Sequence, residues 1–151
     1  MATSPEGVPQ SELARAFRAL FLAELGSVPH VEDLSDPYQL VIPPAHADVG
    51  ELRIRDECDE LTIYLGAHHH WHIPLYMFED SPEDQRVNVA ARAALESVGR
   101  VLEGSTILRL TYRGATVVSS TTYTPEQSME PLSPSEVEFV WTGPRERSPA
   151  V

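Results

Sequence analysis

A long helix predicted in the middle of the chain divides the remaining sequence into two sets of short strands. The segment Ser81-Pro82-Glu83-Asp84 combines a serine N-cap, a proline at the first helical position and an acid three residues after the cap. We expect this helix to run to about Glu103, with Gly104 ending it. Its apolar face consists of Val87, Ala90, Ala91, Ala94, Leu95, Val98, Val101 and Leu102. A helix at this place interrupts the run of strands that a barrel needs.

A first amphipathic helix is predicted near the start of the chain. Ser11 is a suitable N-cap, and Gly26 and Pro29 stop the helix. Its apolar residues recur at helical spacing: Leu13, Phe17, Leu20, Phe21 and Leu25.

Short segments with strand character lie between and after the two helices. They occupy about 38–42, 51–55, 61–65, 107–112, 115–123 and 136–142. Leu108 and Leu110 alternate with Arg109, which indicates a sheet buried on one side. The order α-β-β-β-α-β-β-β predicts an α+β fold, a mostly antiparallel sheet with two helices packed on one face. We expect a single domain over 11–142, a disordered lead-in over 1–10 and a flexible tail over 143–151.

The most unusual local chemistry is the segment His68-His69-His70-Trp71-His72, which holds four of the six histidines. If the strand that begins at Leu61 continues through this segment, its side chains alternate between two faces. One face then carries Thr62, Tyr64, His68, His70 and His72. The other face turns His69 and Trp71 toward the core. Three imidazoles on one face could bind a metal, move protons, or contact a partner in a pH-dependent way.

One interpretation is a metal-binding protein or hydrolase centred on His68, His70 and His72. Imidazole is a common ligand of zinc and nickel, and His70 and His72 could supply two ligands to one ion. A third ligand from His68 needs a twisted or bulged strand, because positions i and i+4 of an extended strand lie about 13 Å apart. The spacing also satisfies the alternating pattern of histidine-triad nucleotide hydrolases, without their polar, glycine-containing lead-in. The sequence contains no other catalytic motif, so an enzyme is the less favoured class and no catalytic residue is assigned.

The net charge of −12 restricts the class of partner. All eleven basic residues are arginines and are spread thinly among 23 acids, which argues against nucleic acid and favours a basic protein. Residues 1–10 lack the basic and apolar regions of a signal peptide, and no run of about 18 apolar residues occurs. The single cysteine, Cys58, suits a reducing compartment. We expect a soluble cytoplasmic protein with no membrane association and no cofactor.

The segment from Asp59 to Gly66, followed by His70-Trp71-His72 and the helix that starts at Ser81, resembles a group of small bacterial α+β proteins. In that group a strand ends in glycine, a His-x-His element follows, and an acidic helix comes next. The resemblance covers residues 59–103, and Ile73-Pro74-Leu75-Tyr76 departs from the aromatic and acidic residues expected there. Some proteins of this type are immunity proteins that neutralise toxins.

Together, these observations predict a cytoplasmic bacterial acidic binding protein of the immunity type. We expect it to engage a basic protein partner through a surface that contains Tyr64, His68, His70, His72 and Tyr76, since exposed aromatic residues often concentrate binding energy.

Overall fold

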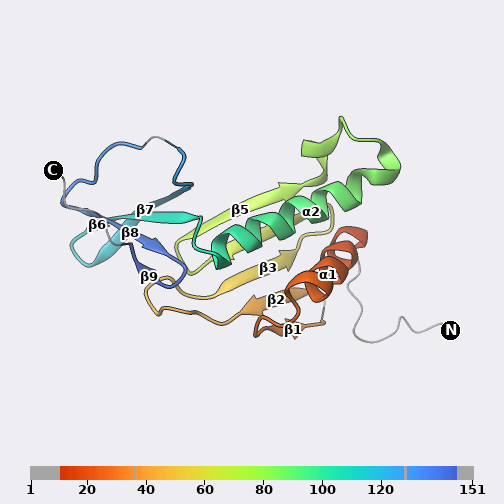
Figure 1. The fold of residues 1–151 in the computed structure, drawn as a ribbon, viewed down its shortest axis with the longest axis horizontal. Coiled ribbons are helices and arrows are strands. Elements are labelled where there is room, and N and C mark those ends of the chain that lie inside the picture. Colours follow the sequence, from red (N-terminus) through yellow and green to blue (C-terminus); the bar gives the residue numbers. More distant parts are fainter. Residues whose placement is uncertain (1–10, 36, 128, 146–151) are drawn as a thin grey trace.

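The computed structural model describes residues 11–35, 37–127 and 129–145, and over these ranges it contains two α-helices and two antiparallel sheets (Figure 1). The first sheet has the strand order β1-β2-β3-β4-β5, formed by Val31–Asp33, Gln39–Ile42, Leu52–Asp56, Glu60–Leu65 and His69–Pro74. The second has the order β7-β6-β8-β9, formed by Thr116–Tyr123, Ile107–Arg113, Glu136–Val140 and Gly143–Pro144. The predicted α+β class and the order of helix, strands, helix and strands are confirmed.

Helix α1 (Glu12–Leu25) begins as predicted. The hydroxyl oxygen of Ser11 accepts a hydrogen bond from the Ala14 backbone N–H at 3.0 Å, and the same hydroxyl donates to Asp56 Oδ1 at 2.7 Å. Because Asp56 ends β3, this cap also ties the helix to the sheet. The helix buries Leu13, Ala14, Phe17 and Phe21.

Helix α2 (Glu83–Leu102) differs from the prediction at its start. Pro82 rather than Ser81 is the N-cap residue, because its extended backbone (φ −52°, ψ 140°) keeps it outside the helix, and no side chain caps the first turn. The predicted end is confirmed. Gly104 N–H donates to Val101 O at 3.1 Å and Ser105 N–H donates to Arg100 O at 2.9 Å, the pair of bonds of a Schellman motif.

Both helices lie side by side against one face of the five-stranded sheet (Figure 1). The short 3-10 helix η1 (Leu75–Phe78) connects β5 to α2. The sheet contributes alternate residues to the core beneath the helices: Leu40, Ile42, Leu52, Ile54, Leu61, Ile63 and Leu65. The opposite face of this sheet is left uncovered by α1 and α2.

The strands after α2 form a sheet of their own instead of extending the first one. Leu108, Leu110 and Phe139 nevertheless belong to the same hydrophobic core as the helices and the five-stranded sheet. A period of two identifies which face of a strand is buried but does not identify its hydrogen-bonded neighbour, so the division into two sheets is not visible in the pattern.

The predicted polar face of the strand that contains Arg109 is partly buried. Arg109 is 5% exposed and its Nη2 lies 3.0 Å from Oε2 of Glu138, which is 3% exposed. Tyr123 donates its hydroxyl to the same carboxylate, and Arg145 Nη1 lies 3.2 Å from Oε1. A buried ion pair with several hydrogen bonds therefore occupies a position that alternation assigned to solvent.

The predicted continuation of the strand through the histidine segment is wrong. The chain reverses at Gly66, Ala67 and His68, and β5 returns antiparallel to β4 with Leu65 opposite His69 and Ile63 opposite Trp71. Gly66 makes this turn possible, since its φ is +60° and a Cβ there would lie 2.0 Å from Val49 O.

The predicted lead-in, 1–10, and most of the predicted tail, 146–151, lie outside the described residues. Gly143 and Pro144 form β9 and pair with β8. Neither of the two helices described is long and apolar enough to cross a membrane.

Candidate functional site

Strand β5 turns its alternate side chains to two different environments. His70 and His72 are exposed on the uncovered face of the five-stranded sheet, next to Tyr64 on β4. His69 and Trp71 are half-buried on the opposite side, as expected. The predicted alternation therefore holds within β5, although the strand itself runs in the opposite direction to the prediction. His68 is exposed in the turn and does not share a face with His70 and His72.

A row of flat side chains crosses three strands on the uncovered face. Arg53 on β3 is paired with Tyr64 on β4, and Tyr64 is paired with His70 on β5. The Arg53 guanidinium carbon lies 4.4 Å from the centre of the Tyr64 ring, and the Tyr64 and His70 ring centres are 5.5 Å apart. His72 meets His70 edge to face at 5.2 Å. We call Arg53, Tyr64, His70 and His72 the stacked row.

Arg53 combines a buried donor that makes no hydrogen bond with a charge that has no carboxylate partner within the described residues. Its Nε–H is buried and has no hydrogen-bond acceptor within the described residues, and no carboxylate pairs with its guanidinium there. The Nε–H of Arg55, on the same strand, also makes no hydrogen bond within the described residues, but its Nε lies 3.3 Å from Glu57 Oε1. An arginine that has no carboxylate, in a chain with 23 acids, is a cation available to an external acceptor.

Sequence analysis alone did not identify Arg53. The alternation of Leu52, Arg53 and Ile54 places Arg53 opposite the core, which is a detectable signal. Its contact with Tyr64 depends on the register between β3 and β4, which the pattern leaves open.

The imidazoles on the uncovered face do not form a three-ligand metal site. His72 Nδ1 lies 3.1 Å from Thr62 Oγ1 and 3.2 Å from Glu60 Oε1. In the described part of the chain, no three His, Cys, Asp or Glu side chains are arranged to hold a metal ion. The hydrolase or metal-binding alternative thus loses its third imidazole, because His68 is in the turn. Binding of zinc or nickel by His70 and His72 alone stays a prediction.

His69 connects the five-stranded sheet to the four-stranded one. Its Nδ1 lies 2.9 Å from Ser120 Oγ on β7, and the Ser120 hydroxyl donates to the His68 carbonyl at 2.6 Å. Since that hydroxyl has one hydrogen, Nδ1 of His69 carries the proton and donates to Ser120. The remaining nitrogen, Nε2, lies 3.4 Å from Thr122 Oγ1 and accepts from it. Burial, with a smaller contribution from His70, lowers the pKa of His69 and favours this neutral form.

Tyr76 lies apart from the stacked row. It is on η1 and is 70% exposed. The Leu75 backbone N–H donates to Asp59 O, which places the start of η1 at the end of the β4–β5 hairpin remote from Gly66. The structure therefore brings Tyr64, His70 and His72 together and leaves His68 and Tyr76 at opposite ends of the hairpin.

Comparisons of the chain with protein-family models, with curated proteins and with solved structures find no match. The resemblance to small bacterial α+β proteins therefore stays a prediction.

Proposed function

We propose that this protein binds another protein through the uncovered face of the five-stranded sheet, with the stacked row at the centre of the interface. The observation that carries the proposal is the guanidinium of Arg53, which is held flat on the Tyr64 ring and has no carboxylate partner within the described residues. A partner that brings a carboxylate or carbonyl oxygen to this point would satisfy a buried donor that water reaches poorly.

The composition of the row supports a concentrated binding site. Tyrosine and arginine are enriched among the residues that dominate interface energies. Tyr64 and Arg53 are held in place by stacking before any partner arrives, so binding orders few additional side-chain torsions.

The charge of the whole chain supports a basic partner. A net charge of −12 attracts a protein of opposite charge and accelerates their encounter, while the row supplies the local contact. The immunity role, in which the partner is a toxin, and the cytoplasmic location are narrower predictions that this proposal does not require.

Affinity capture with matched variants tests the proposal. The wild-type protein should recover a basic partner from cells that express it, with less recovered at about 0.5 M salt than at about 0.15 M, because salt screens the attraction. Tyr64→Ala and Arg53→Ala should each weaken the purified complex about thirtyfold or more, as measured by calorimetry. Arg15→Ala is the matched control, since Arg15 is exposed on α1 and has no ion pair within the described residues.

Two results would contradict this proposal. One is a partner that Arg53→Ala and Tyr64→Ala bind as tightly as the wild type does. The other is a partner that Arg15→Ala loses to the same degree, since α1 lies on the opposite side of the sheet. A Tyr76→Ala variant separately tests whether the predicted contribution of Tyr76 exists.

A further inference from the structure

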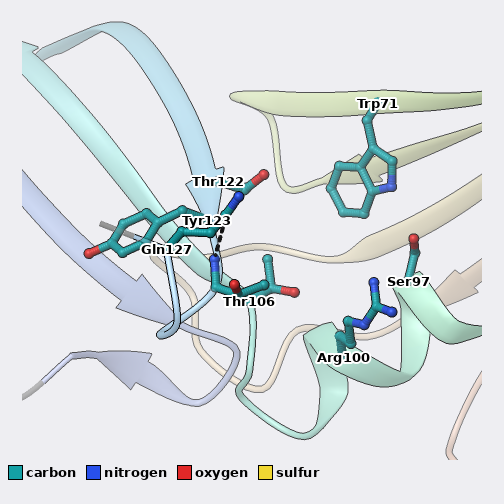
Figure 2. Close-up of a pocket in the computed structure, with 8 residues that line it drawn as sticks. Trp71, Ser97, Arg100, Thr106, Thr122, Tyr123 and Gln127 are labelled. Atoms are coloured by element: carbon teal, nitrogen blue, oxygen red, sulfur yellow. Dashed lines mark hydrogen bonds between the residues drawn. The ribbon is translucent and has the colours of Figure 1, made fainter. Parts of the chain in front are cut away.

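A small cleft lies where the two sheets and the end of α2 meet (Figure 2). Its volume is about 170 Å³, and an apolar cavity of about 150 Å³ is large enough to hold one benzene molecule. The side chains around it include Trp71, Ser97, Arg100, Thr106, Thr122 and Gln127. The site therefore has room for a single ring with one small substituent.

The walls of this cleft offer hydrogen-bond donors that lack protein partners. Within the described residues, the indole N–H of Trp71 and the hydroxyl of Ser97 make no hydrogen bond. The amide oxygen of Gln127 accepts from the Thr124 backbone N–H at 2.8 Å, which leaves the amide NH2 group to donate elsewhere (Figure 2). Several unpaired donors around one small space favour a ligand that is rich in acceptors.

The residues that line the cleft carry a positive charge, opposite in sign to the net charge of the chain. Arg100 lines it, and neither Asp nor Glu is among its lining residues. Three other clefts on the surface are each lined by at least one glutamate, which is Glu96 in one, Glu24 in another and Glu51 in the third. The nearest carboxylate that pairs with Arg100 is that of Glu96, at 4.0 Å, and both side chains are more than half exposed. An exposed ion pair of this kind contributes little free energy, so an anionic ligand can take the place of the Glu96 carboxylate beside Arg100.

The back of the cleft is fixed in place before a ligand binds. Thr122 is held by His69, which is held in turn by Ser120. The indole of Trp71 packs partly against the hydrophobic core and leaves one part of its surface toward the cleft (Figure 2). A flat apolar wall and a guanidinium at the mouth suit a molecule with a ring and a carboxylate.

We propose that this cleft binds a small organic carboxylate, with its ring against the Trp71 indole and its carboxylate held by Arg100. The site does not depend on the proposed protein-binding surface. Trp71 and the stacked row project from opposite sides of β5, so either proposal can fail while the other holds.

Benzoate is the probe that tests this proposal, with the indole N–H resonance of Trp71 as the readout. The chain has two tryptophans, and a Trp141→Phe variant identifies which of the two indole signals belongs to Trp71. Benzoate should shift the Trp71 signal in a saturable way at millimolar concentrations or below. Benzamide, a neutral molecule of the same shape, should bind about tenfold more weakly, because it lacks the charge that Arg100 recognises.

Matched variants show which side chains contribute to the affinity for benzoate. Arg100→Gln should weaken benzoate binding about tenfold, and Gln127→Ala should weaken it by a smaller factor. Arg113→Gln should change it less than twofold, since Arg113 is an exposed arginine in another part of the fold, at the end of β6.

Three outcomes would overturn the proposal. The first is the absence of a saturable shift at about 20 mM benzoate. The second is an equal loss of affinity in Arg100→Gln and Arg113→Gln. The third is inorganic phosphate that binds as tightly as benzoate, which would show that the site holds any anion and that the ring contributes nothing.

Discussion

The hydrogen bonds that His69 makes between the two sheets depend on its protonation state. His69 must stay neutral to accept from Thr122 while it donates to Ser120. Burial lowers its pKa below the ordinary value of 6.5. As pH falls through 6.5, the unfolded chain therefore takes up a proton that the folded chain does not. The stabilising contribution of a neutral His69 is complete above pH 6.5 and is lost as the pH falls toward the folded pKa.

A His69→Gln variant should show a smaller loss of stability on acidification than the wild type. Glutamine keeps a donor and an acceptor but cannot take up a proton. Urea denaturation at pH 7 and about pH 5.5 measures the free energy of unfolding of both proteins. Equal losses in the two proteins would show that His69 titrates in the same way in the folded and the unfolded chain.

Gly66 is the residue on which the β4–β5 turn depends. A Cβ at Gly66 would lie 2.0 Å from Val49 O, a clash that only movement of the backbone can relieve. Gly114 is a suitable control, since its φ of +65° is similar but a Cβ there meets nothing within 4 Å. We expect Gly114→Ala to cost about 1 kcal/mol and Gly66→Ala about 3 kcal/mol or more. Denaturation midpoints measure both, and equal costs would mean that the contact with Val49 adds nothing.

At the scale of elements, the buried charges that join β6 to β8 contribute strongly to stability. Arg109→Gln should destabilise the fold by about 3 kcal/mol, because it removes one arginine from a carboxylate that is 3% exposed. The matched change Arg92→Gln should cost about 1 kcal/mol or less, since Arg92 and Glu24 form a pair that is nearly half exposed on both sides. Urea denaturation compares the two, and a loss from Arg92→Gln as large as that from Arg109→Gln would contradict this assignment.

The elements also show where sequence patterns are informative. Both helices were predicted because their apolar residues recur every three or four positions over many turns, and the Gly104 stop was correct. The β4–β5 turn was missed because Gly66-Ala67-His68 lacks the Asn-Gly or Asp-Gly pairs that mark short hairpins. The close contact between Gly66 and Val49 that fixes this turn joins residues distant in sequence. No local pattern could have indicated it.

The sequence predicted the part of the candidate site that lies within a single strand, and did not predict the contacts between elements. Alternation within β5 correctly separated His70 and His72 from His69 and Trp71. Arg53 and Arg100 were not found, because their roles depend on which strand or helix end lies next to them. The buried position of Arg109 likewise depends on Glu138, which reaches it from another strand. Contacts of this kind are decided by tertiary packing rather than by local periodicity.

At the scale of the whole molecule, the two sheets should unfold together. Leu108, Leu110 and Phe139 of the second sheet share one core with the first sheet and the helices, so neither sheet has a complete core of its own. The two tryptophans report on each part separately, because Trp71 is on β5 and Trp141 directly follows β8.

Single-tryptophan variants test this cooperativity. Trp71→Phe leaves Trp141 as the reporter, and Trp141→Phe leaves Trp71. Within each variant, the fluorescence transition in urea should coincide with the transition measured by circular dichroism. A fluorescence midpoint that differs from the circular dichroism midpoint in the same variant would show that the sheets unfold as separate units.

The contact between Gly66 and the chain at Val49 and Gly50 has a consequence for the evolution of this molecule. Sliding β5 past β4 by one residue would exchange its two sides, so that His70 and His72 would point toward the cleft and Trp71 into solvent. A few backbone atoms at the hairpin tip therefore fix which side chains of β5 face each of the two surfaces. Sequence drift should be tolerated more readily at Ala67 and His68 than at Gly66, because an altered Gly66 could erase both surfaces in a single step.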